Sequence, residues 1–130
     1  MTSDADSSAS PGMPAGHAAI PEIDPTQLRQ FLASGERHLL LDVREPRELE
    51  AGHIEGQVNI PLGQLVFRMS ELDGWQDELV VCICRVGIRS RFAAELLHHS
   101  GFKRLANLAG GYVAWQADDP CDIDSGEAQP

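Results

Sequence analysis

The chain has 130 residues, of which 42% are hydrophobic and 23% charged, and its formal net charge is −10 at pH 7. This length suffices for one hydrophobic core of ordinary size. The acidic balance argues against nucleic acid as a partner, and no apolar run approaches the roughly 18 residues of a membrane span, so we expect no membrane partner either. The acidic, polar start shows no secretory pattern, and the three cysteines lack zinc-ligand spacing. We therefore expect a cytoplasmic protein with free thiols and no metal.

The negative charge lies mainly at the two ends. Residues 1–24 contain four acidic residues and residues 118–130 contain five, and neither segment has a Lys or Arg. Both ends are rich in small and polar residues, which bury little apolar surface. We predict that residues 1–17 and 118–130 are disordered and that residues 18–117 form the folded domain.

Strand and helix patterns alternate between these ends. Asp24 followed by Pro25 is typical of a helix start. Helices are predicted over 25–33, 46–51, 62–72, 89–100 and 111–116, and strands over 38–43, 57–60, 79–84 and 103–108. Two of the strands, 38–43 and 79–84, are almost continuously apolar, which indicates burial on both faces. The alternation predicts an α/β fold with three layers, in which helices cover both faces of a mainly parallel central sheet.

The most informative segment is CRVGIRS, residues 84–90, between a predicted strand and a predicted helix. Cys84 therefore stands at the carboxyl end of a buried strand, where active sites of such sheets lie. A cationic turn containing glycine can aim several backbone N–H groups at one point, as does the start of the next helix. This setting favours a thiolate nucleophile beside an anion site. A buried, inert cysteine is the alternative, which we expect for Cys82 with its apolar neighbours.

Four stretches together resemble the rhodanese family of sulfurtransferases. CRVGIRS resembles the family's active-site loop. LLDVREPRELEAGHIEGQVNIP, residues 40–61, resembles D-V-R-E-x-x-E-(Y/F)-x-x-G-H-I-x-G-A, with Leu49 and Gln57 as departures. NLAGGYVAW, residues 107–115, resembles L-x-G-G-x-x-x-W, and residues 23–28 resemble the opening I-x-P-x-x-L. The resemblance covers about residues 20–116 and implies a single-domain rhodanese-like fold with about five strands.

The resemblance implies an enzyme like thiosulfate sulfurtransferase. The Cys84 thiolate is expected to take the outer sulfur of a small anionic donor such as thiosulfate, forming a persulfide. Cyanide, a thiol or a protein thiol then accepts the sulfur, and no cofactor is needed. The predicted substrate-binding residues follow the cysteine, and the predicted loop supports follow a neighbouring strand. They are Arg85, Val86, Gly87, Ile88, Arg89 and Ser90 for binding, and Asp42 and Arg44 for support.

These residues are expected to have different tasks. Backbone N–H groups of residues 86–90 stabilise the thiolate and the outer sulfur. Arg85 attracts the anionic donor. Arg89 shapes the loop by binding carbonyls and a carboxylate, for which Asp42 or Glu45 is the expected partner. Ser90 is expected to cap the following helix rather than donate to sulfur.

Two alternatives remain. Phosphatases and arsenate reductases also combine a cysteine, a loop and an arginine, but their loops have five residues between the two and this chain has four. The smaller loop fits one sulfur atom better than a tetrahedral oxyanion. A non-catalytic rhodanese-like interaction module is the second alternative, although such modules typically lose the cysteine that this chain keeps. We expect no general base at His53, because a thiolate held by dipoles needs none.

Overall fold

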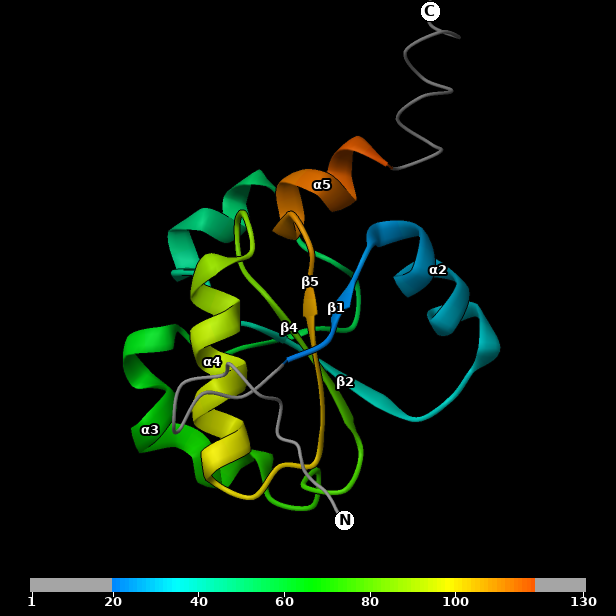
Figure 1. Cartoon of the computed structure of the whole chain (residues 1–130). Coiled ribbons are helices and arrows are strands. Elements are labelled where there is room, and N and C mark those ends of the chain that lie inside the picture. The colour runs from blue at the N-terminus through cyan, green and yellow to red at the C-terminus, as the bar shows by residue number, and fades with distance from the viewer. Residues whose placement is uncertain (1–19, 119–130) are drawn as a thin grey trace, which may run out of the picture.

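The computed structural model describes residues 20–118 (Figure 1). Of the segments predicted to be disordered, 1–17 and 118–130, only Asp118 lies among the described residues, and Cys121 lies outside them. Within residues 20–118, no helix is long and apolar enough to cross a membrane.

A five-stranded sheet forms the centre, in the order β1-β5-β4-β2-β3 with every neighbouring pair parallel. The strands are β1 Glu22–Ile23, β2 His38–Asp42, β3 Val58–Asn59, β4 Leu79–Ile83 and β5 Arg104–Leu108. This confirms the predicted α/β fold. The sequence pattern missed β1, because a strand of two residues is too short to show alternation.

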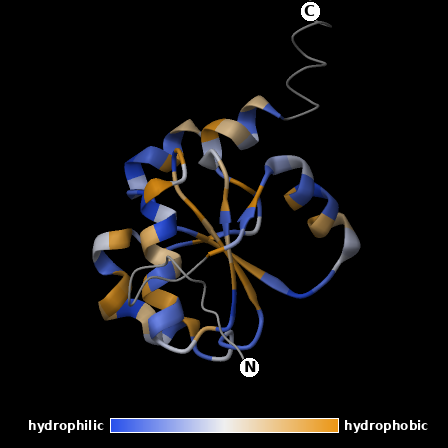
Figure 2. Cartoon of the chain, viewed as in Figure 1, coloured by the Kyte–Doolittle hydropathy of each residue, from blue (hydrophilic) through white to orange (hydrophobic). Residues whose placement is uncertain are grey.

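Helices cover both faces of the sheet. They are α2 Pro25–Ser34, α3 Leu65–Arg68, α4 Ile88–His99 and α5 Gly111–Ala117, with 3-10 segments η1 Pro46–Ala51, η2 Leu62–Gln64 and η3 Met69–Leu72. Figure 1 shows α3 and α4 on one side of the sheet and α2 on the other. The central parts of the strands are largely hydrophobic (Figure 2). One core cluster joins β2 and β4 to α3 and α4, and the other joins the opposite strand faces to α2 and α5.

The start of α2 is as predicted. Asp24 accepts a hydrogen bond from the backbone N–H of Gln27 at 2.8 Å, and the Gln27 side chain accepts one from the backbone N–H of Asp24 at 2.9 Å. This reciprocal pair provides acceptors for two backbone N–H groups that have no hydrogen-bond partner within the helix.

Two helix predictions need correction. The segment 62–72 is not one helix but η2, α3 and η3 in succession. In α4, the helical spacing of Phe92, Ala93, Leu96 and Leu97 predicts that all four face inward, but Phe92 is 58% exposed and Leu96 36% exposed. Ala93 and Leu97 do face the sheet, together with Ala94. The small alanines allow a close approach between α4 and the strands, so the larger side chains at 92 and 96 lie on the outer row.

Candidate active site

Cys84 follows the last residue of β4 and is 1% exposed. Its Sγ accepts a hydrogen bond from the backbone N–H of Gly87 at 3.0 Å and lies 3.2 Å from the hydroxyl of Ser90. Burial raises the pKa of the Cys84 thiol. Hydrogen bonds from the Ser90 hydroxyl and from the backbone N–H groups of Ser90, Gly87 and Val86 outweigh burial, so the pKa is lowered.

Cys82, two residues earlier on β4, differs sharply from Cys84. It is fully buried, and burial together with the charge of Cys84 raises the pKa of its thiol to about 12. The two cysteines differ because Cys82 lies within β4, whereas Cys84 follows the strand at the point where N–H groups converge.

The expectation for Ser90 is wrong. Gly87, in the left-handed region at φ 103°, is the N-cap of α4, and Ser90 lies one turn inside the helix. Its buried hydroxyl lies between Cys84 Sγ and the side-chain oxygen of Asn107, within hydrogen-bond reach of both. Ser90 therefore belongs to the immediate surroundings of the sulfur.

The carbonyl groups of the cysteine loop are held away from the sulfur. The backbone N–H of Tyr112 donates to Cys84 O at 2.8 Å, and that of Val113 donates to Arg85 O at 3.1 Å. The side-chain amide of Asn107 donates to Gly87 O at 3.0 Å. Since the carbonyls are bound on the outside, the N–H groups remain free to point at Sγ.

Gly111 makes this arrangement possible. Its φ is 63°, and a Cβ at this position would lie 2.4 Å from Arg85 O and 2.6 Å from Cys84 O. Only glycine permits both the left-handed backbone and this approach of α5 to the loop. The G-G pair of the C-terminal motif thus positions the loop that carries Cys84.

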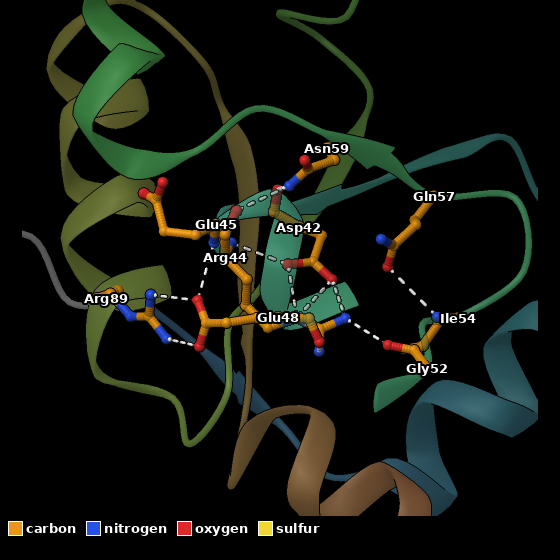
Figure 3. A network of polar contacts seen from close by, with 9 residues as sticks. All are labelled: Asp42, Arg44, Glu45, Glu48, Gly52, Ile54, Gln57, Asn59 and Arg89. Atoms are coloured by element: carbon orange, nitrogen blue, oxygen red, sulfur yellow. Dashed lines mark hydrogen bonds and ion pairs between the residues drawn. The ribbon is translucent and has the colours of Figure 1, made fainter. Parts of the chain in front are cut away.

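Arg89 forms a two-pronged ion pair with Glu48 of η1, with Nη1 to Oε1 and Nη2 to Oε2 both at 2.8 Å (Figure 3). The expected partners, Asp42 and Glu45, are not the ones that bind it. Asp42 is engaged by Arg44, and η1 turns Glu48 toward the cysteine loop. The hydrogen bonds from Arg89 are the main reason that the pKa of Glu48 falls from 4.5 to about 2.

Asp42 and Arg44 form a buried ion pair beneath this contact, with Nη2 2.8 Å from Oδ2. Arg44 also donates to the backbone carbonyls of Gly52 at 2.9 Å and Glu48 at 3.3 Å, and its guanidinium lies 4.6 Å from the Tyr112 ring centre. Figure 3 shows Arg44 between the end of β2 and the turn that follows η1. The pair thus holds the segment that carries Glu48.

The side chains of Arg85, Val86 and Ile88 are exposed around the buried cysteine. Arg85 has no ion-pair partner within residues 20–118, so its charge is available to an anion. His53 is exposed and lines a separate pocket with Pro46 and Leu49 that includes no residue of the loop 84–90. In the described part of the chain, no group of three or more His, Cys, Asp or Glu side chains could hold a metal ion.

Sequence reasoning missed Glu48 and Asn107. Glu48 lies within the stretch 40–61 that resembles the family motif, but it is 41 residues from Arg89 along the chain, and the sequence gives no sign of their contact. Asn107 is the penultimate residue of β5 and interrupts its apolar run with a polar side chain that is 1% exposed. A buried polar residue at the carboxyl end of a parallel strand was the available signal.

A parallel α/β sheet that places a cysteine of lowered pKa in a loop of N–H donors is typical of proteins that use a cysteine thiolate. The comparisons agree, because the family model described as "Rhodanese-like domain" matches residues 24–118. The chain therefore belongs to the rhodanese family, and the names of its relatives support an enzyme of that family.

Three relatives illustrate the similarity. A protein named "Sulfurtransferase" from Allochromatium vinosum is 41% identical over 96 residues, which cover 74% of this chain and 88% of the relative. "Thiosulfate sulfurtransferase GlpE" from Pseudomonas aeruginosa is 32% identical over 107 residues, 82% of this chain and 94% of the relative. The solved structure of the human single-domain sulfurtransferase TSTD1 is 32% identical with a TM-score of 0.65, and the match covers 78% of this chain and 99% of that one.

Proposed function

We propose that this protein transfers sulfane sulfur through a persulfide on Cys84, with thiosulfate or a similar small anion as donor. The observation that carries the proposal is the convergence of N–H and hydroxyl donors on a buried Sγ whose pKa is lowered. A relative named for thiosulfate supports the choice of donor.

The reaction has two steps. The Cys84 thiolate attacks the outer sulfur of thiosulfate, the S–S bond of the donor breaks, and sulfite leaves with the bonding electron pair. The new outer sulfur carries the negative charge and faces the N–H groups of the loop. A thiol, a protein thiol or cyanide then attacks this outer sulfur and releases the Cys84 thiolate. Arg85 attracts the doubly charged donor to the loop.

The state of Arg89 favours this function over a phosphatase or arsenate reductase. In that chemistry the arginine after the loop must bind the oxyanion. Here both terminal nitrogens of Arg89 are bound by Glu48. The guanidinium therefore braces the loop, and the four-residue spacing between Cys84 and Arg89 leaves room for one sulfur atom. We further propose a reducing, cytoplasmic location, because Cys82 and Cys84 are both free thiols.

A turnover assay tests the function. The purified chain should form thiocyanate from thiosulfate and cyanide, and the same sample should not hydrolyse an aryl phosphate at enzymatic rates. Cys84→Ala removes the nucleophile and should abolish thiocyanate formation. Phosphate release that depends on Cys84, without thiocyanate formation, would contradict the proposal.

A further inference from the structure

The side chain of Asn107 connects the sulfur site to β1. Its Nδ2 donates to Gly87 O at 3.0 Å and to the two carboxylate oxygens of Glu22 at 3.1 and 3.2 Å. Glu22 is in turn paired with Arg91. A carbonyl and a carboxylate only accept hydrogen bonds, so the NH2 group of Asn107 must face both of them. Its Oδ1 therefore faces the Ser90 hydroxyl, with which it forms a hydrogen bond.

Ser90 has one hydroxyl proton and two acceptors within reach. One is Asn107 Oδ1 and the other is Cys84 Sγ at 3.2 Å. Both Ser90 and Asn107 are buried, with exposed fractions of 0% and 1%, so water does not readily replace a lost partner. The two acceptors must therefore share one proton.

We propose that Asn107 is a positioning residue that competes with Cys84 for the hydroxyl proton of Ser90. When Cys84 is a thiol, its S–H donates to the Ser90 oxygen and Ser90 donates to Asn107. When Cys84 is a thiolate, the charged sulfur is the stronger acceptor and the Ser90 hydroxyl rotates to it. Asn107 Oδ1 then loses its donor.

Persulfide formation reverses this rotation. The thiolate and thiosulfate give the persulfide anion and sulfite, so the charge is conserved and moves to the outer sulfur. Cys84 Sγ becomes a neutral, weak acceptor, and the Ser90 hydroxyl returns to Asn107. Asn107 thus stabilises the persulfide form of Cys84 relative to the free thiolate. This consequence rests on the proposed function, whereas the competition for the proton does not.

Other groups near the sulfur do not account for such an effect. Among residues 20–118, Cys82 of β4 and Arg89 of α4 interact electrostatically with Cys84. Cys82 is buried on the strand, and Arg89 is bound by Glu48. Glu22, behind Asn107 on β1, is bound by Arg91.

The test is the pH dependence of the alkylation of Cys84 by iodoacetamide, which reports the thiolate, in a Cys82→Ala background. In Asn107→Leu, the sulfur is the one acceptor left for the Ser90 hydroxyl proton. The midpoint of the pH dependence of alkylation should therefore move to lower pH. Below the wild-type midpoint, alkylation should be about two- to fivefold faster, the effect of one hydrogen bond. Ser90→Ala should move the midpoint to higher pH. In the Ser90→Ala background, Asn107→Leu should not lower the midpoint, because the shift to lower pH requires the Ser90 hydroxyl.

A purely structural role predicts the opposite sign. If Asn107 only held the loop, its loss would misplace the N–H donors and move the midpoint to higher pH, both with Ser90 in place and in the Ser90→Ala background. That result would overturn the proposal. Asn59→Leu of β3 is the control: it also removes an amide that donates to backbone carbonyls, those of Asp42 and Arg44, and should lower stability without moving the midpoint. Asn107→Val carries the same expectation if Asn107→Leu does not fold.

A second measurement addresses the persulfide form of Cys84. At a fixed ratio of thiosulfate to sulfite, the fraction of persulfide should be lower in Asn107→Leu than in the wild type. An equal or higher fraction would contradict the assigned preference for the persulfide. If the wild type forms no persulfide at all, the proposed function fails, while the alkylation result still decides the competition for the proton.

Discussion

Glu48 of η1 and Arg89 of α4 join the loop after β2 to the loop after β4 through two parallel hydrogen bonds of 2.8 Å. Arg44 donates to the backbone carbonyl of Glu48 and is itself paired with Asp42. The contact between Glu48 and Arg89 therefore connects this buried ion pair to the cysteine loop. The sulfur site thus depends on residues of two different strand ends.

The first prediction concerns acid stability. The folded-state pKa of Glu48 is about 2, against an ordinary 4.5. The stabilisation by the Arg89 pair is therefore complete above about pH 4.5 and is lost as the pH falls toward 2. Glu48→Gln should lower the free energy of unfolding at pH 7 by about 1 kcal/mol, since the pair is partly exposed. Urea titrations between pH 2 and 7 should show this difference shrinking with acid; a difference that is constant with pH would contradict the account.

The second prediction concerns Arg85. Under the proposed function its exposed charge attracts the donor before any bond changes, so Arg85→Ala should raise KM for thiosulfate while kcat changes little. Arg85→Lys keeps the charge and should restore most of the affinity. A neutral sulfur donor should be much less affected by either change. Steady-state kinetics with both donors test this, and an equal loss with both would contradict the assigned role.

The third prediction concerns Gly111. In Gly111→Ala the added Cβ would clash with the carbonyls of Cys84 and Arg85. The loop must therefore shift, and its N–H groups would no longer point at Cys84 Sγ. Loss of one aimed donor in comparable sites costs about 10²-fold or more in kcat. Gly63→Ala is the matched control, since no atom lies within 4 Å of its added Cβ. A variant at 111 as active as the variant at 63 would show that this approach does not position the loop.

The sequence allowed prediction of the sheet and the position of Cys84 because both depend on local patterns. Apolar runs define β2 and β4, and a cationic, glycine-containing turn marks the loop between β4 and α4. The partner of Arg89 could not be derived in this way. The choice among Asp42, Glu45 and Glu48 depends on the turn of η1, which decides which carboxylate faces α4. Ser90 was misassigned for a similar reason, since the glycine at position 87 starts the helix three residues earlier than a serine cap would.

The position of Asn107 shows the same limit. Its side chain reaches Ser90, Gly87 and Glu22, which come from α4, its preceding loop and β1. These contacts exist only because β5 lies between β1 and β4 in the sheet. Strand order is a tertiary property, so the linear pattern indicates a buried amide but not its partners.

The central claim is tested most directly by locating the transferred sulfur. After incubation with thiosulfate and removal of excess donor, mass spectrometry of the intact chain should show the addition of one sulfur atom, and fragmentation should place it on Cys84. Cys84→Ser should show no adduct, and Cys82→Ala should keep it, because the thiol of Cys82 is buried with a pKa of about 12. An adduct located on Cys82 or Cys121, or one that survives Cys84→Ser, would contradict the assignment of Cys84 as the sulfur carrier.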